Sequence, residues 1–437
     1  MSVNIEEMTA QDIFVQLETM DRQRTDLQKR FNEKFIEEFR NEEVPEHTGK
    51  NIGDWSEIYT FFRILEQGKI NTADDEMNVI YEAYLPVLKI FREEDGNKID
   101  YYTANEGNGP LALKICYHGI KEPLSCMSVT AYRAQAEFLL RKLQEKKAEG
   151  QTSSIIIPET FEFLDRIFIR KIKAPASSVS ELFGDKIDIT LEVSQSDNLR
   201  VPAGFSIKSE LGSKSTLINA SGANDVHFLL YGCDDVLMNE INESRSSGKK
   251  WVVNRVRAMQ NAGITFCYDR FGYDDDTMMN NLSLISDRMP EVVAYSILSA
   301  YLHPVDGGDG NNNKMTSVVN TLCDSNPLDI ESDTYLYYSK RLKDFLFEFA
   351  CGMQSATPWD GTTKIRGGYI FVKKNGEILA YYASEQDNYK NWLFNNTFFE
   401  TPSSSRHERN NRSMGFICKD EDGSYYFTLG LQVKFNQ

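Results

Sequence analysis

Two neighbouring stretches decide the predicted fold: Lys186-Ile187-Asp188-Ile189-Thr190-Leu191-Glu192-Val193 and Gly204-Phe205-Ser206-Ile207-Lys208-Ser209-Glu210-Leu211. In both, apolar and polar residues largely alternate, which is typical of β-strands with one buried face. The polar residues 194–203 between them suit the turn of a β-hairpin. Helical patterns occur elsewhere in the chain, so we expect an α/β (α+β) fold with a mixed central sheet flanked by helices.

The polar face of this hairpin gathers the first candidate site. If Asp188 lies opposite Lys208, the apolar faces of the two strands coincide, because the two positions have the same parity. The turn is then centred near residue 198, and Asp188 becomes a neighbour of Ser206 and Lys208. A simple solvent-exposed face is the alternative interpretation of Ser206, Lys208 and Glu210.

A carboxylate beside a lysine suits phosphodiester hydrolysis. Asp188 can hold Mg²⁺ through oxygen, and the backbone carbonyl of Ile207 can supply a second oxygen. Lys208 can orient a water molecule and stabilise the charge that develops on phosphorus. The pattern matches the Asp…(Asp/Glu)-x-Lys signature of a large nuclease superfamily, the PD-(D/E)xK enzymes, except that Ser206 replaces the second carboxylate. A metal then needs another acid, for which the candidates are Glu57, Asp197 and Glu210, and a salt bridge is the alternative for each.

The composition limits the possible partners. The net charge is −17 and the sequence pI about 4.9, which by themselves argue against a nucleic-acid partner. Net charge governs long-range approach, however, and a groove can still be locally basic. The seven cysteines form no Cys-x-x-Cys pair and only five histidines occur, so neither a zinc site nor a disulfide framework is expected. With no membrane-length apolar run and no signal peptide, we expect a soluble cytoplasmic protein.

Periodicity predicts the other elements. Residues 8–40 form one predicted helix with a stripe of apolar residues, either a brace along the body of the protein or a dimerising coil. A second helix follows through about Gln67, with Asp54 as a plausible N-cap and Gly68 as its stop. Strands are predicted near 79–92, 99–102 and 426–435, and helices at 130–149, 234–246, 274–286 and 289–301. Asn375-Gly376 predicts a type I′ hairpin turn within residues 368–381.

The sequence resembles the HpaII-type restriction endonucleases in a collinear set of motifs from Gly53 to Phe435. They are Gly53-Asp54-Trp55-Ser56-Glu57-Ile58-Tyr59, Ile64-Leu65-Glu66-Gln67-Gly68-Lys69, Lys186-Ile187-Asp188-Ile189, Gly204 to Gly212, Thr216 to Ser221, Trp359-Asp360-Gly361, Gly367-Gly368-Tyr369, Glu400 to His407 and Leu431 to Phe435. Residues 1–50 lie outside the resemblance. We therefore expect a helical N-terminal extension at 1–50 and a catalytic and DNA-recognition region at 51–437.

The resemblance implies a type II restriction endonuclease with a PD-(D/E)xK-like core. Such an enzyme needs Mg²⁺, cuts double-stranded DNA at a specific sequence and belongs to a restriction–modification system with a cognate DNA methyltransferase. Carried over by residue, Asp188 and Lys208 are the catalytic pair and Glu57 is the helix-borne acid. Relatives include enzymes that cut a palindromic CCGG site, and a symmetric target implies a homodimer.

Two segments are candidates for DNA contacts. The loop from Thr401 to Arg412 combines hydroxyls and arginines that suit phosphates and guanine edges: Ser404, Ser405, Arg406, Arg409 and Arg412. An ordinary surface loop is the alternative. Asn219 and Ser221, just past the catalytic strand, suit either a DNA contact or the cap of a following helix.

Two other functions remain open at this stage. A non-catalytic DNA-binding or scaffold protein would explain the missing carboxylate at Ser206. A nicking or structure-selective nuclease of the same fold would use the same residues on other substrates.

Overall fold

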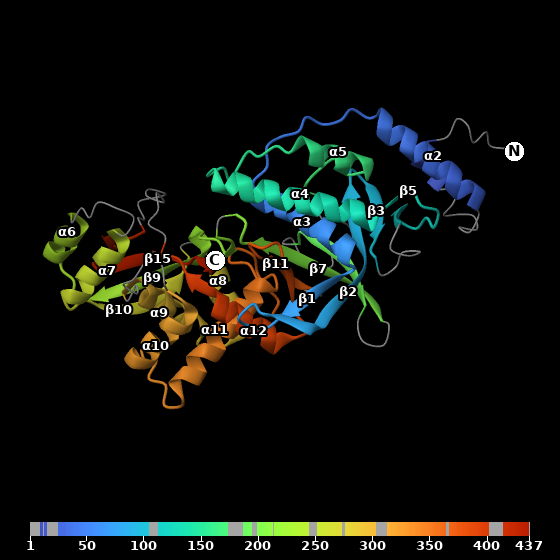
Figure 1. Ribbon diagram of the computed structural model, residues 1–437. Coiled ribbons are helices and arrows are strands. Elements are labelled where there is room, and N and C mark those ends of the chain that lie inside the picture. The colour runs from blue at the N-terminus through green and yellow to red at the C-terminus, as the bar shows by residue number, and fades with distance from the viewer. Residues whose placement is uncertain are drawn as a thin grey trace. The chain divides into compact units, whose positions relative to one another are not determined.

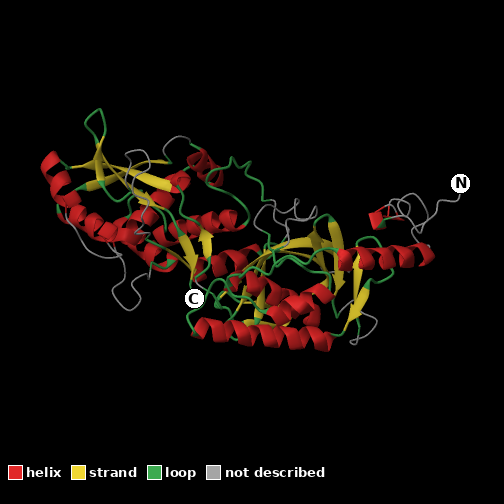
Figure 2. Ribbon diagram, turned by 90° about the horizontal axis from the view of Figure 1, so that it is seen from above, coloured by secondary structure: helices red, strands yellow, loops and turns green. Residues whose placement is uncertain are grey.

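The structure is a computed structural model that describes residues 9–11, 13–14, 25–104, 112–173, 187–194, 199–212, 214–243, 251–272, 276–302, 313–363, 367–401 and 414–436. The chain divides into two compact units. Unit 1 comprises residues 1–213 and 364–384, and unit 2 comprises residues 214–363 and 385–437. Both units combine helices and strands (Figure 2), which confirms the mixed α/β class. The boundary expected near residue 50 stays a prediction.

Unit 1 contains the predicted catalytic hairpin. Its elements are α2 (Thr25–Asn41), α3 (Ile52–Gln67), β1 (Lys69–Ala73), β2 (Val79–Glu94), β3 (Asn97–Tyr102), β4 (Leu113–Tyr117), β5 (Ser125–Met127), α4 (Val129–Ala148), α5 (Pro158–Arg166), β6 (Ile189–Ser194), β7 (Arg200–Ser209), β11 (Gly368–Val372) and β12 (Ile378–Tyr382). The strands predicted near 79–92 and 99–102 and the helix predicted at 130–149 are confirmed as β2, β3 and α4.

Nine strands form one mixed sheet in the order β1-β12-β11-β7-β6-β2-β3-β4-β5. The pairs β11–β7 and β1–β12 are parallel, and the other neighbours are antiparallel. Because β1 also pairs with β2, six strands close into a ring, which the sequence did not predict. The long strand β2 makes closure possible: its first half pairs with β1 and its second half with β6 and β3. The change of partner falls beside Pro86, which has no N–H to donate.

Helices α3, α4 and α5 gather on one side of this sheet (Figure 1). Trp55 and Phe62 of α3 are fully buried in the core that this packing creates. Helix α3 begins at a capping box in which Asn51 is the N-cap residue and Asp54 the third helical residue, so the prediction of Asp54 as the cap is wrong. The Asn51 side chain accepts from the Asp54 N–H at 2.9 Å, as an N-cap residue does from the first turn of a helix. The predicted stop at Gly68 is confirmed, with φ of 65°.

Helix α2 uses its apolar stripe inside unit 1. Leu27, Phe31 and Phe35 are buried, and the rings of Phe31 and Phe35 contact Tyr117 edge-on at 4.8 and 5.3 Å. This face of the predicted N-terminal helix therefore braces the body of the protein, the first of the two interpretations. Residues 15–24 of that predicted helix lie outside the described residues.

The hairpin turns differ from the prediction. A type I′ turn needs positive φ at both central residues, and the described residue Asn375 is not among the non-glycine residues with positive φ. Instead Gly376 donates to the carbonyl of Lys373, with φ of 85°, so that the loop is a turn followed by a left-handed glycine. The dipeptide with positive φ at both positions is Asp95-Gly96, between β2 and β3.

Unit 2 contains β8 (Thr216–Ile218), the 3₁₀ helix η4 (Gly222–Asn224), β9 (Asp225–Tyr231), α6 (Asp235–Glu243), α7 (Trp251–Asn261), β10 (Thr265–Phe271), α8 (Thr277–Ile285), α9 (Met289–Leu302), α10 (Met315–Ser325), α11 (Thr334–Ala350), α12 (Gln386–Asn396), β13 (Thr397–Phe399), β14 (Ile417–Lys419), β15 (Tyr425–Gly430) and β16 (Val433–Phe435). Two sheets are present, in the orders β10-β9-β15-β14 and β13-β16-β8. The single strand predicted at 426–435 is therefore two strands in different sheets. The predicted helices are confirmed as α6, α8 and α9.

Among the residues that the structure describes, no helix combines the length and apolar character needed to span a membrane.

The β11–β12 turn is locked onto α3, which yields a stability prediction. The Tyr59 hydroxyl donates to the Gly376 carbonyl, and a Cβ at Gly376 would collide with Tyr59 Oη and a methyl group of Leu140. Gly96 has nearly the same φ, 83°, but open space around it. We expect Gly96→Ala to lower the free energy of unfolding by about 1–2 kcal/mol through backbone strain. Gly376→Ala should lose about 1–3 kcal/mol more through overpacking.

Urea denaturation of the two variants measures this difference. Equal losses at the two glycines would show that the contact with α3 contributes nothing.

Candidate active site

Asp188 is held in place by the neighbouring strand. It directly precedes β6, and its N–H donates to the Phe205 carbonyl at 3.0 Å. Its Oδ2 accepts from the Ser206 hydroxyl at 3.0 Å and from the Ile207 N–H at 2.7 Å. Both side-chain bonds therefore fall on one carboxylate oxygen, and the carboxylate is fixed against β7.

The observed register corrects the predicted one. Ile189 pairs with Phe205, so Asp188 lies beside Ser206 rather than opposite Lys208. The prediction was wrong by two residues, because the turn between the strands is centred near 197 rather than 198. A shift of two keeps every side chain on its face, so the predicted grouping of Asp188, Ser206 and Lys208 on one side is retained.

Lys208 lies two residues further along β7. Its Nζ is 5.5 Å from the ring centre of Tyr369, on the adjacent strand β11. Burial lowers the pKa of Lys208, while the carboxylates of Asp188 and Glu57 act in the opposite direction. The ammonium thus sits in a partly buried place close enough to both acids to be influenced by them.

Glu57 reaches the same cluster from helix α3. Burial and the neighbouring Asp188 carboxylate raise the pKa of Glu57 to about 8, while Lys173 and Arg92 lower it. The structure therefore brings Glu57, Asp188 and Lys208 together from a helix and two strands, although Glu57 is far away in the sequence. A hydrogen bond of 2.9 Å between the hydroxyls of Ser56 and Ser209 helps to hold α3 against β7 beside them.

Two residues of this cluster were missed by sequence reasoning. Lys173 Nζ lies 2.9 Å from Asp54 Oδ1, and the acids Asp54, Glu57 and Asp188 raise the pKa of Lys173. Asp54 was considered only as a helix cap. Lys173 ends the basic run Arg170-Lys171-Ile172-Lys173 ahead of the predicted hairpin, and no motif distinguishes it from its basic neighbours.

The donor set fits Mg²⁺ in part. Among the described residues, no three acidic, histidine or cysteine side chains form a group that could enclose a metal ion. Mg²⁺ is usually held by one or two carboxylates together with waters and substrate phosphates, rather than by an all-protein cage. The mutual repulsion of Glu57 and Asp188 marks a position where a cation would relieve an unfavourable charge pair. These two carboxylates therefore suit such an ion.

The other candidate ligands have different surroundings. Glu210 Oε2 accepts from the Lys374 N–H at 2.9 Å, in the β11–β12 turn. The Ile207 N–H binds Asp188, and a role for the Ile207 carbonyl stays a prediction. Asp197 lies outside the described residues.

The expected DNA contacts stay predictions. Ser221 directly precedes η4 in unit 2, and its N–H donates to Asn224 Oδ1 at 2.9 Å. The Asn219 carbonyl accepts from Asn224 Nδ2 at 2.9 Å. These bonds agree with the capping interpretation of this segment. Ser404, Ser405, Arg406, Arg409 and Arg412 lie outside the described residues.

Comparison with known proteins identifies the family. The family described as HpaII restriction endonuclease matches residues 51–435. The chain is 29% identical over 386 residues to "Type II restriction enzyme HpaII" of Haemophilus parainfluenzae, an alignment that covers 88% of this chain and 98% of the relative. No solved structure matches the chain. Since the family match spans most of the chain, the chain belongs to the HpaII restriction endonuclease family and is a type II site-specific deoxyribonuclease.

Proposed function

We propose that this enzyme hydrolyses double-stranded DNA with Mg²⁺ at a PD-(D/E)xK-like site made of Asp188, Glu57 and Lys208. The observation that carries the proposal is their convergence: Glu57 from α3 and Lys208 from β7 are both influenced by the charge of Asp188. Family membership supports the nuclease activity and disfavours a non-catalytic scaffold.

Asp188 and Glu57 would hold the metal ion. The two described side-chain bonds of Asp188 fall on Oδ2, which leaves Oδ1 to face a cation. Glu57 would serve as a ligand in its ionised form, which its raised pKa disfavours unless a positive charge is near. When bound, Mg²⁺ polarises the phosphate and lowers the pKa of a coordinated water.

Ser206 and Lys208 would act on the same strand in different ways. Ser206 stands where the superfamily signature has a carboxylate, and here its hydroxyl donates to Asp188 and fixes that side chain. Lys208 would orient the attacking water and stabilise the negative charge that grows on the phosphate oxygens. Its partly desolvated environment strengthens both interactions, because charges attract more strongly away from bulk water.

Lys208→Ala tests the proposal. With Mg²⁺ and unmethylated DNA of varied sequence, cleavage should fall by at least about 10²–10³-fold, because a charge stabiliser of the transition state is lost. In a gel-shift assay without Mg²⁺, the variant should still bind DNA. Cleavage by this variant at the wild-type rate would refute the assigned role.

Two further variants serve as controls for the loss of cleavage in Lys208→Ala. Ser206→Ala keeps the Ile207 N–H bond to Asp188 and loses the hydroxyl bond, so cleavage should fall by only about 10–100-fold, as for other groups that orient a metal ligand. Lys98→Ala removes a lysine of the same sheet that lies 4.0 Å from Glu93, and should cut at the wild-type rate.

Glu57→Gln separates catalysis from stability. Cleavage should be lost with the acid. In the absence of metal, however, the variant should be more stable than the wild type. Folding raises the pKa of Glu57 from 4.5 to about 8, so the protonated form stabilises the fold below pH 4.5, and this contribution disappears as the pH rises to about 8.

Thermal melting in EDTA at pH 5, 7 and 9 measures the effect. The excess in Tm of Glu57→Gln over the wild type should grow across this range, and added Mg²⁺ should reduce it by stabilising the wild type. A difference in Tm that does not change with pH would contradict the charge pair.

We also propose a homodimer on DNA, a short palindromic target with CCGG as the first candidate, and protection of the cell's own DNA by a methyltransferase in the cytoplasm. A two-fold target places two scissile bonds in equivalent positions, which a two-fold dimer matches. Sedimentation velocity with an oligonucleotide that the enzyme cuts should show two chains per duplex. One chain per duplex at saturation would exclude the dimer.

A further inference from the structure

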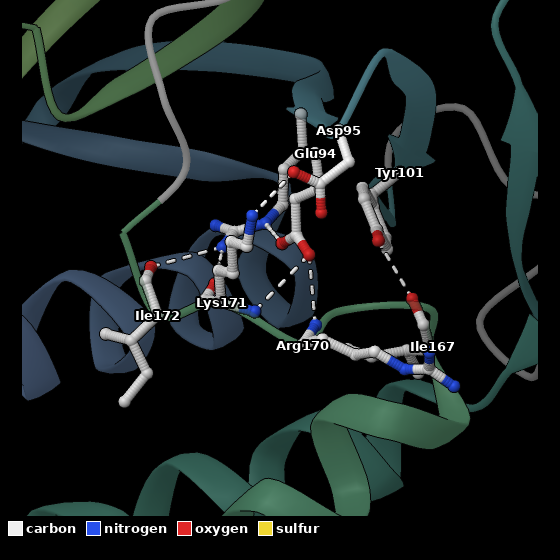
Figure 3. Close-up of polar contacts among 8 residues, drawn as sticks. Glu94, Asp95, Tyr101, Ile167, Arg170, Lys171 and Ile172 are labelled. Atoms are coloured by element: carbon white, nitrogen blue, oxygen red, sulfur yellow. Dashed lines mark hydrogen bonds and ion pairs between the residues drawn. The ribbon is translucent and has the colours of Figure 1, made fainter. Parts of the chain in front are cut away.

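A short segment after α5, residues 167–173 and here called the strap, is fixed to the sheet through its backbone. The Tyr101 hydroxyl donates to the Ile167 carbonyl at 2.8 Å. Glu94 Oε2 accepts from the N–H groups of Arg170 at 3.0 Å and Lys171 at 3.3 Å (Figure 3). The β2–β3 hairpin thus binds the strap at both its beginning and its middle.

Arg92 completes this attachment. Its guanidinium donates to the carbonyls of Lys171 and Ile172, and its Nε donates to Glu94 Oε1 at 2.6 Å. Arg92 and Glu94, the clamp, therefore bind four backbone groups in three successive residues of the strap. Their side chains are only 11% and 13% exposed, so the clamp is mostly removed from water. A desolvated ion pair contributes little net stability but strongly specifies geometry when all its hydrogen bonds are made.

The strap is also tied to helix α2. The Arg170 guanidinium lies 3.9 Å from the ring centre of Phe39 and donates to the Phe39 carbonyl. The same group pairs with Glu42 at 3.1 Å and with Asp165 at 3.2 Å. Every described residue from 170 to 172 is therefore held in place, and the position of the next residue, Lys173, follows from this.

Lys173 stands at the edge of the catalytic acids. Its side chain is 64% exposed, and its Nζ lies 2.9 Å from Asp54 Oδ1. Glu57 and Asp188 are close enough to stabilise its charged form. The ammonium is thus anchored on one side and accessible from solvent on the other.

We propose that Lys173 is a second lysine of the active site that binds the DNA backbone phosphate beside the scissile bond, and that Arg92 and Glu94 are positioning residues that place it there. This proposal rests on the proposed function of Asp188, Glu57 and Lys208.

The local charges favour a phosphate as the partner of Lys173. Three acids, Asp54, Glu57 and Asp188, face two lysines, Lys173 and Lys208. When a bound Mg²⁺ neutralises the charge of Glu57 and Asp188, Asp54 is the remaining partner of Lys173. A phosphodiester can then replace Asp54 at the Lys173 ammonium. Asp54 then keeps its structural role, because its Oδ2 accepts the Asn51 N–H at 3.3 Å in the capping box. An exposed ammonium can make this exchange without a change in the fold.

A pair of matched variants tests the contact. Lys173→Gln and Lys171→Gln remove the same charge from the same strap. The Lys171 ammonium, however, pairs with Asp95 in the turn between β2 and β3. In the Lys208→Ala background with Mg²⁺ present, adding Lys173→Gln should decrease the slope of log K for DNA binding against log salt by about one, since one phosphate contact is lost. Cleavage by Lys173→Gln alone should fall by about 10–100-fold and be partly rescued in Lys173→Arg. Lys171→Gln should leave both quantities unchanged.

A double-mutant cycle tests the clamp. Arg92→Ala should lower cleavage in the wild type but add little in the Lys173→Gln background, because the clamp acts through Lys173. If Arg92→Ala does not fold, Glu94→Gln weakens the clamp and keeps the shape of the side chain. Equal losses in both backgrounds would overturn the positioning role.

Failure of this inference is distinguishable from failure of the proposed function. An unchanged salt slope and unchanged cleavage in Lys173→Gln, with Lys208→Ala inactive, would overturn the phosphate contact alone. Wild-type cleavage by Lys208→Ala would overturn both.

Discussion

The two hydrogen bonds to Asp188 Oδ2 are the constraint on which the cluster of Asp188, Glu57 and Lys208 depends. They come from consecutive residues of β7, a hydroxyl and a backbone N–H, and bonds to an ionised carboxylate are stronger than neutral ones. Because Lys208 lies on the same strand, β7 sets the positions of both Asp188 and Lys208. Strand β7 itself pairs with β6 on one side and with β11 on the other, inside a closed ring. It cannot slip without breaking both ladders, so the ring keeps the two groups in register.

Helix α3 adds the second acid at a cost in stability. Its buried face anchors it through Trp55 and Phe62, and the Ser56–Ser209 bond fixes it against β7. The same packing holds Glu57 where burial and Asp188 oppose its ionisation. Charge pairs of this kind reduce the stability of the metal-free fold, and they occur where a site is arranged for a ligand it does not yet hold. The proposed metal binding accounts for the position of Glu57, whereas the stability of the metal-free fold does not.

The parts of the fold that follow from local pattern were predictable, and those that follow from pairing over long distances were not. The alternation of polar and apolar residues placed Asp188, Ser206 and Lys208 on one face. The predicted register was wrong by two residues, but an even shift leaves every side chain on the same face, so this grouping was still correct. Asn375-Gly376 and Asp95-Gly96 carry equivalent turn signals, yet only Asp95-Gly96 is left-handed at both positions, because the packing of Tyr59 on Gly376 selects another loop. Closure of the ring depends on which strands β2 meets, and periodicity carries no information about partners. Glu57 was one of three candidate acids in the sequence, and the family resemblance favoured it over the other two. The proposed role of Lys173 has no sequence motif, because it would depend on the clamp between Arg92 and Glu94.

The net charge of −17 bears on how the proposed lysine contacts could hold DNA. A strongly acidic protein repels DNA at long range, but at physiological salt such repulsion is screened beyond about 8 Å. Binding must then come from cations that act at contact distance inside the site. A mobile surface lysine loses side-chain entropy when it binds a phosphate, whereas a lysine on a fixed strap loses less of its freedom. Holding the backbone of residues 170–172 with a mostly buried ion pair is therefore a reasonable arrangement for a protein in which acidic residues outnumber basic ones.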